Sequence, residues 1–147
     1  MDPLRVAELE RRLGYRFRDP FLLEEALTHA SFANEHPPSA DQARLAFLGD
    51  AALGLVVADR LMADHPAATV GDLTTGRAAL VTGVRLARWG AALELGALLR
   101  LGRGEDQSGG RARDSILAST LEAVLGAVYR DGGLDEVRLV IGRLAAW

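Results

Sequence analysis

The stretch Arg44-Leu45-Ala46-Phe47-Leu48-Gly49-Asp50-Ala51-Ala52-Leu53 is mostly apolar and helix-forming, and Asp50 is its only acid. Positions 43, 46 and 50 are spaced three and four residues apart, so on a helix their side chains lie on one face. A metal-dependent nuclease would carry carboxylates on such a face, because Mg²⁺ takes oxygen ligands and bridges to phosphate. Ala43 and Ala46 supply none. The stretch therefore predicts an active-site helix from which acids are missing.

Length and composition predict one globular domain over residues 1–147, because the chain is 49% hydrophobic. No run reaches the roughly 18 apolar residues of a membrane span, and residues 1–6 lack the pattern of a signal peptide, so we expect a cytoplasmic protein. The absence of cysteine excludes disulfides and thiolate chemistry. All 17 basic residues are arginine and the net charge is −3, so any RNA contact would depend on a local patch or another domain.

Apolar residues recur at helical spacing along almost the whole chain, and no run of alternating β-branched residues predicts a strand. Asp19-Pro20 is a typical helix start, and Asp114 or Ser115 would cap a later helix. Residues 34–40 and 101–110 are predicted loops, because they are rich in proline or glycine. The pattern therefore predicts a compact all-α domain. The predicted helices are one ending before Gly14, then 21–28, 41–64 (buried through the centre), 71 to beyond 80, 83–93, 116–129 and 134–147.

A second acid, Glu122, lies among apolar residues of the predicted helix 116–129. A carboxylate in so apolar a helix needs a partner or a metal ion. Ser119 lies three residues earlier, on nearly the same face. Two interpretations remain open from the residues alone: Asp50 and Glu122 share a functional site, or each pairs with an arginine or a helix N-terminus.

Several segments resemble the ribonuclease III family, and they follow its order over nearly the whole chain. The resemblance implies an all-α, homodimeric helical bundle with the ribonuclease III endonuclease-domain fold. It also implies Mg²⁺-dependent cleavage of double-stranded RNA. The resembling segments are Leu13 to Phe17, Leu22-Leu23, Ala26 to Ser31, Leu45 to Leu53, Leu101 to Glu105, Ser108 to Arg111, Ser115 to Ala118, Glu122 to Tyr129 and Asp131 to Gly133.

The resemblance implies one metal site of four carboxylates in each subunit. Asp50 and Glu122 occupy two of these catalytic and metal-binding positions, and the other two fall on Ala46 and Ser119. A unit charge 4 Å from a cation contributes about 4 kcal/mol at an effective dielectric near 20. We therefore expect weak or absent Mg²⁺ binding, with Mn²⁺ as another candidate ion.

Two further acidic positions of the family, at the implied dimer interface, fall on Ala43 and Val70. Few other acids could replace the missing ligands. An acid eight or nine residues from Asp50 or Glu122 lies about 12 Å away along a helix, too far to bind the same ion. Glu105, in a predicted loop, is the one acid that this argument leaves. The acids that it excludes are Asp41, Asp59 and Asp114.

Other side chains have two interpretations each. The resemblance places Phe47 where an aromatic inserts into the partner subunit; otherwise it is a core residue. His29 is interpreted as a helix-packing residue, because no nucleophile constellation accompanies it. Arg103, Arg111 and Arg113, with Arg100 nearby, form a candidate RNA contact; otherwise they belong to a solvated loop.

Two functions follow. The first is a homodimer that binds or scaffolds structured or double-stranded RNA, for example in a ribonucleoprotein, with cleavage lost or impaired. The alternative is an active Mg²⁺-dependent, double-strand-specific endoribonuclease in RNA processing that uses Asp50, Glu122 and RNA phosphates. The chain ends at Trp147, before the double-stranded-RNA-binding domain of common bacterial members. Either the sequence is shortened or RNA affinity depends on the nuclease-like domain alone.

Overall fold

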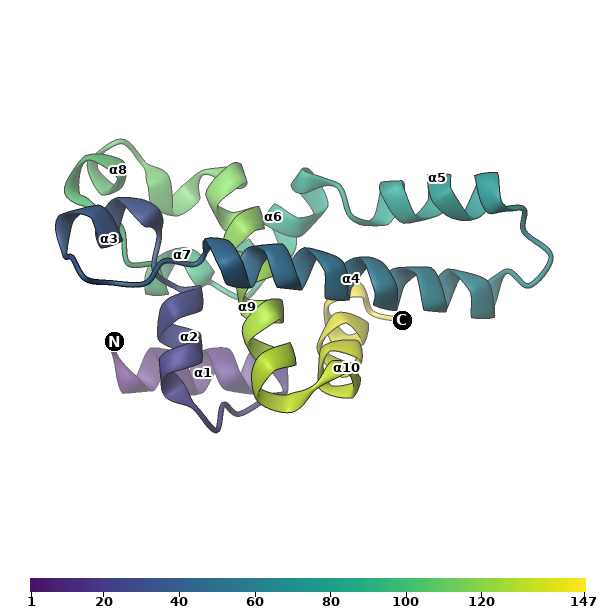
Figure 1. Cartoon of the computed structure of the whole chain (residues 1–147), viewed down its shortest axis with the longest axis horizontal. Helices are drawn as coiled ribbons and strands as arrows, with labels where there is room; N and C mark the ends of the chain where they lie inside the picture. Colours follow the sequence, from purple (N-terminus) through teal and green to yellow (C-terminus); the bar gives the residue numbers. More distant parts are fainter.

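Two long helices, α4 (Ala43–Asp64) and α9 (Asp114–Gly132), cross at the centre of the molecule and form its most extensive helix pair (Figure 1). The computed structural model describes all residues from 1 to 147, and no β-sheet is present. The predicted all-α class is therefore confirmed. The other elements are α1 (Pro3–Leu13), α2 (Pro20–Ala26), α3 (Ala30–Glu35), α5 (Val70–Leu80), α6 (Gly83–Ala92), α7 (Leu95–Leu98), α8 (Arg103–Gln107), the 3₁₀ turn η1 (Gly110–Ala112) and α10 (Leu134–Ala145).

The crossing of α4 and α9 depends on two glycines that let the backbones touch. A Cβ added at Gly49 would lie 1.7 Å from the carbonyl oxygen of Glu122. A Cβ added at Gly126 would lie 2.1 Å from the carbonyl oxygen of Leu45. Any side chain at either position would hold the helices apart. Because Gly49 and Gly126 have no side chains, the two helices approach closely and bring the residues next to the crossing near one another.

Local signals explain where most helices begin. Asp19 accepts the Phe21 amide at 3.0 Å and caps α2, as predicted. Helix α5 begins one residue before the prediction, because Thr69 and Asp72 form a capping box. The prediction of a side-chain cap for α9 was wrong. Arg113 holds the cap position without a side-chain hydrogen bond, and Asp114 is already the first helical residue.

Both predicted loops contain helical turns, so the predictions of irregular structure at 34–40 and 101–110 were partly wrong. Helix α3 reaches Glu35, and α8 and part of η1 occupy the second segment. Contacts distant in sequence stabilise them: the Gly102 amide donates to the Ser31 hydroxyl at 2.9 Å, and the Arg103 amide donates to the Glu35 carboxylate at 3.1 Å. Such partners are invisible to a local pattern.

The second half of α4 and the whole of α5 form a hairpin that projects from the body of the molecule (Figure 1). No residue of α5 is buried, and no residue of α4 after Val57 is buried. The prediction that the helix over 41–64 runs buried through the centre was therefore wrong for the part after Val57. Helix α10 is tied to this half of α4 by an ion pair of 2.7 Å between Arg138 and Asp59. None of the helices combines the length and hydropathy needed to span a membrane.

Candidate functional site

Asp50 of α4 and Glu122 of α9 lie together where the two helices cross. The two side chains lie close enough for a protonated Glu122 to donate a hydrogen bond to Asp50. Gly49 precedes Asp50 and touches the backbone of Glu122, so the close crossing brings the two carboxyl groups together. Neither acid forms an ion pair with an arginine. The alternative in which each acid has its own arginine is therefore wrong.

The surroundings of Glu122 favour the protonated form of its carboxyl group. Burial, together with the hydrogen bond and the negative charge of Asp50, raises the pKa of Glu122 to about 7. Asp50 itself is exposed. Near neutral pH the pair therefore carries less negative charge than two free carboxylates. A cation would have to displace this proton in order to bind both groups.

A hollow of about 320 Å³ lies beside Ala46 and Ser119, each within one helical turn of an acid of the pair. Its walls come from α4, from α9 and from the start of α3. Ala43 also lines it, so three of the positions where the resemblance expected acids meet at one place. The remaining lining residues are His29, Ala30, Asp41, Gln42, Ser115 and Ile116.

A buried polar contact joins the two helices at this hollow. The Gln42 amide nitrogen donates to the Ala26 carbonyl at 2.8 Å and to the Thr120 hydroxyl at 3.2 Å. Both side chains are almost fully buried, so loss of either would leave a polar group without its partner. The sequence analysis missed this pair. A threonine in the middle of an apolar helix was the available signal, but its partner lies 78 residues away.

His29 caps a helix. Its Nδ1 accepts the Ser31 amide at 3.1 Å at the start of α3, and the ring also contacts the hollow. The contacts thus give His29 a structural role as the cap of α3. Asp41, which axial distance had excluded as a ligand beside Asp50, lines the same hollow and accepts the Ala43 amide at 2.9 Å.

Asp50 and Glu122 are the two retained members of the implied Mg²⁺ donor set. Asp50 and Glu122 supply carboxylates, but no group of three or more acidic, histidine or cysteine side chains is placed to hold an ion. Glu105, the remaining substitute from the sequence analysis, lies in α8 and forms an ion pair with Arg113. Mg²⁺ usually keeps several waters and binds one or two carboxylates together with substrate phosphates, so RNA phosphates and water would have to complete a site on Asp50 and Glu122.

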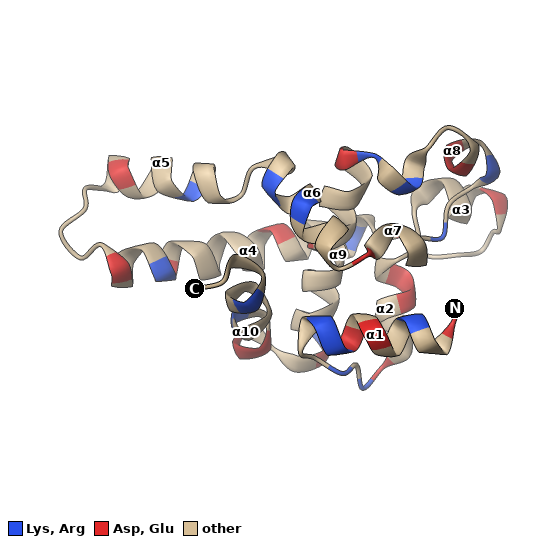
Figure 2. Ribbon diagram, turned by 180° about the vertical axis from the view of Figure 1, so that it is seen from behind, with Lys and Arg blue, Asp and Glu red and all other residues tan.

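Two of the three candidate RNA-contacting arginines hold the segment from α7 to η1 together. Arg111 donates to the carbonyl oxygens of Gly96 and Leu99 and pairs with Asp106. Arg113 pairs with Glu105. Arg103 is exposed and has no ion pair. Basic residues elsewhere are interleaved with acids over the helices (Figure 2). An RNA contact by these arginines stays a prediction, and Arg103 is the one whose guanidinium is available.

Phe47 is an exposed side chain, with 82% of its surface accessible. The interpretation as a core phenylalanine was therefore wrong. A hollow of about 640 Å³ lies beside it, with walls that include Leu22, Leu48 and Arg130. Val70, at the start of α5, is 81% exposed, and its side chain is aliphatic where the resemblance expected an acid.

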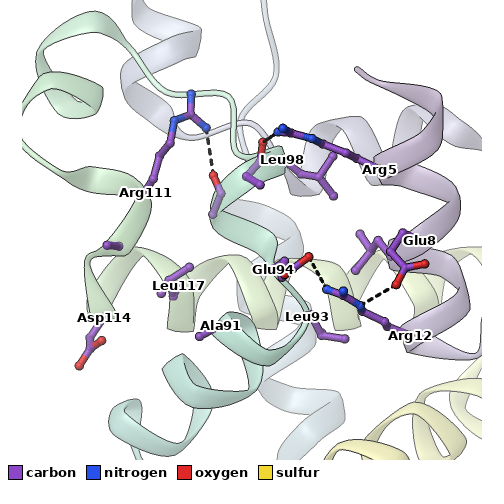
Figure 3. Close-up of a pocket in the computed structure, with 14 residues that line it drawn as sticks. Arg5, Glu8, Arg12, Ala91, Leu93, Glu94, Leu98, Arg111, Asp114 and Leu117 are labelled. Atoms are coloured by element: carbon purple, nitrogen blue, oxygen red, sulfur yellow. Dashed lines mark hydrogen bonds and ion pairs between the residues drawn. The ribbon is translucent and has the colours of Figure 1, made fainter.

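A larger cavity, of about 730 Å³, lies between α1, α6, α7 and α9 (Figure 3). Its arginines already have protein partners: Arg12 pairs with Glu8 and Glu94, and Arg5 donates to the Ala97 carbonyl at 3.2 Å. Neither Asp50 nor Glu122 lines this cavity. It also shares no lining residue with the hollow beside Ala46 and Ser119.

The fold and the carboxyl pair define an all-α domain of the nuclease type, and comparison with known proteins agrees. The family model described as Ribonuclease-III-like matches residues 19–146. Ribonuclease 3 of Heliobacterium modesticaldum is 49% identical over 141 residues, which are 95% of this chain and 60% of the relative. Ribonuclease 3 of Streptomyces coelicolor is 52% identical over 136 residues, 92% of this chain and 49% of the relative. The chain thus spans about half to three fifths of the length of these relatives.

A solved structure of the nuclease domain of ribonuclease III from Campylobacter jejuni has the same fold. The two superpose with a TM-score of 0.89 at 38% identity, over 95% of this chain and 94% of that one. That structure was described for flexibility in a region involved in dimer formation. The chain belongs to the ribonuclease-III-like family.

Proposed function

We propose that this protein is a homodimer that binds or scaffolds structured or double-stranded RNA, with cleavage lost or strongly impaired. The observation that carries the proposal is the hollow lined by Ala43, Ala46 and Ser119, of which Ala46 and Ser119 lie about one helical turn from Asp50 and Glu122. At these positions the resemblance implies carboxylates of a nuclease site, and small side chains replace half of the implied metal-binding acids.

The chemistry of the remaining residues favours binding over cleavage. A Glu122 carboxyl whose pKa is raised to about 7 provides weak attraction for a cation. Ser115 and Ser119 line the hollow, and hydroxyl groups are suited to hydrogen bonds with phosphate or ribose oxygens. Duplex RNA is recognised by its shape, its phosphates and its 2′-hydroxyls, so we expect little sequence specificity.

The dimer part of the proposal depends on Phe47. An exposed phenylalanine beside a partly apolar hollow is a typical anchor for a protein interface. In a two-fold symmetric dimer each Phe47 would insert into its partner, because both subunits present the same surface. The dimer-forming region described for the Campylobacter jejuni domain supports this arrangement. Residues 1–147 would act as one domain of the assembly.

The alternative, an active Mg²⁺-dependent endoribonuclease in RNA processing, is supported by the retained Asp50–Glu122 contact. Two carboxylates can hold Mg²⁺ when substrate phosphates and water complete the shell. Incubation of the purified protein with long duplex RNA and Mg²⁺ or Mn²⁺ separates the two functions. We expect a gel-shift complex without short products. Efficient cleavage that Glu122→Gln abolishes would establish the nuclease and overturn the proposal.

A gain-of-function variant tests the reason for the loss. Ala46→Glu combined with Ser119→Asp restores carboxylates on the two walls of the hollow, and we expect Mg²⁺-dependent cleavage to appear or to rise at least 100-fold. Ala51→Glu with Tyr129→Asp adds the same charges at exposed positions of the two helices outside the hollow and serves as the control. No gain in the first variant, with an unchanged circular dichroism spectrum, would mean that the loss of activity has another cause.

A further inference from the structure

Three side chains at the end of α3 form a stack in the order Arg100, Phe32, His36. The guanidinium carbon of Arg100 lies 4.3 Å from the centroid of the Phe32 ring. The rings of Phe32 and His36 lie 4.0 Å apart, at an interplanar angle of 12°. Both neighbours are about 4 Å from the same ring, so they must cover its opposite faces. His36 is therefore the outermost layer.

The stack is held in place before any ligand arrives. Arg100 is paired with Glu24 of α2, and the Nδ1 of His36 lies 3.0 Å from the Phe32 carbonyl oxygen. The Ser39 hydroxyl donates to the His36 carbonyl. His36 is nevertheless exposed, whereas Phe32 is half-buried. A flat ring that is fixed on one side and open to solvent on the other loses little conformational entropy on binding.

We propose that the outer face of His36 is a stacking platform for an unpaired nucleobase of RNA that flanks the bound duplex. Aromatic rings and histidine recognise single-stranded RNA by stacking on splayed-out bases, and every base offers a flat face. The inference depends on the proposed RNA-binding function. It adds a second ligand class, the unpaired nucleotide, and a second site on the protein.

The position of the stack fits this role. Helix α3 starts at Ala30, which lines the hollow beside the carboxyl pair, and ends just before His36. Its six residues span roughly 9 Å at 1.5 Å per residue. A strand that leaves the hollow could therefore reach the stack within a few nucleotides.

An arginine near the stack, Arg103, is available to the phosphate of a nucleotide that stacks on His36. Helix α8 packs against α3, and the Arg103 amide donates to Glu35, the residue before His36. The Arg103 guanidinium is exposed, so it is available to a phosphate. The two nearby acids are already engaged, Glu24 with Arg100 and Glu35 with the Arg103 amide.

Fluorescence anisotropy with two RNAs tests the proposal. One is a blunt 20-base-pair duplex, and the other is the same duplex with unpaired five-nucleotide tails that carry 2-aminopurine next to the duplex. We expect the wild type to bind the tailed RNA about tenfold more tightly and to change the 2-aminopurine emission. His36→Ala should reduce this preference toward one, and His36→Phe should keep it because a flat ring remains.

His65→Ala is the matched control, because His65 is also an exposed histidine at a helix C-terminus, at the end of α4. It should leave the preference intact. Equal affinity of the wild type for both RNAs would overturn this inference and leave the duplex-binding function standing. Equal loss in His36→Ala and His36→Phe would also overturn it. Binding of neither RNA would overturn the proposed function and the inference with it.

Discussion

Replacement of Gly49 by alanine tests the closest contact in the fold. The new Cβ would lie 1.7 Å from the Glu122 carbonyl oxygen and 2.8 Å from the Gly126 nitrogen, whereas ordinary Cβ contacts begin near 3.4 Å. To bring the new Cβ from 1.7 Å to an ordinary 3.4 Å from the Glu122 carbonyl oxygen, α4 and α9 would have to move apart by the same difference. Both partner atoms are backbone, so no side chain can move aside. Because overpacking of side chains alone costs about 1–3 kcal/mol, we expect a loss of about 4 kcal/mol or more.

Gly54→Ala, on the same helix, is the internal control. A Cβ at Gly54 would meet no atom within 4 Å. The substitution should therefore raise the free energy of unfolding by about 0.5–1 kcal/mol, because alanine favours the helix over glycine. The same substitution should thus lower the free energy of unfolding at Gly49 and raise it at Gly54, five residues away.

Urea denaturation followed by circular dichroism at 222 nm measures both variants. A loss of 4 kcal/mol is a large part of the roughly 5–15 kcal/mol that stabilises a typical domain, so Gly49→Ala should be partly unfolded in water or unfold at low urea. Free energies of unfolding that agree within 1 kcal/mol for Gly49→Ala and Gly54→Ala would refute the close crossing. They would also remove the argument that this crossing brings Asp50 to Glu122.

Two further predictions concern the carboxyl pair and the dimer. The pKa of Glu122 is about 7 in the folded protein, above its ordinary value of 4.5, so its contribution to stability is fully present below about pH 4.5 and is lost as the pH rises to 7. After allowance for solvent screening at the exposed Asp50, we expect the free energy of unfolding to fall by about 1–2 kcal/mol between pH 5 and pH 8, as measured by urea denaturation. Glu122→Gln should lack this part of the pH dependence. The same pH dependence in the wild type and in Glu122→Gln would contradict the assignment to Glu122. Phe47→Ala should raise the dimer dissociation constant at least tenfold in light scattering, whereas Leu139→Ala, at another exposed apolar position on α10, should not. A wild type that is monomeric at micromolar concentration would contradict the dimer.

Much of the fold follows from local patterns in the chain. The apolar spacing of α4 and α9, and the Asp19-Pro20 start of α2, are properties of neighbouring residues, so their helices were predicted to within a few positions. Helices α3 and α8 were missed, because their stabilising partners are remote in sequence. Gly102 needs Ser31, and the Arg103 amide needs Glu35.

The candidate site shows the same division. The sequence alone was enough to single out Asp50 and Glu122 as unusual acids, because carboxylates are rare in apolar helices. The resemblance to the ribonuclease III family identified Ala46 and Ser119 as missing ligands, and helical spacing placed each on nearly the same face as one of these acids. Only the tertiary structure could show that both gaps open into one hollow.

The raised pKa of Glu122, the exposure of Phe47 and the stack on Phe32 also required the tertiary structure. Each depends on distance and burial between segments that are far apart in the chain or on different faces of a helix. Periodicity identifies a residue's face on its own helix. What packs against that face depends on how the helices approach one another, and here α4 and α9 can touch because Gly49 and Gly126 carry no side chain.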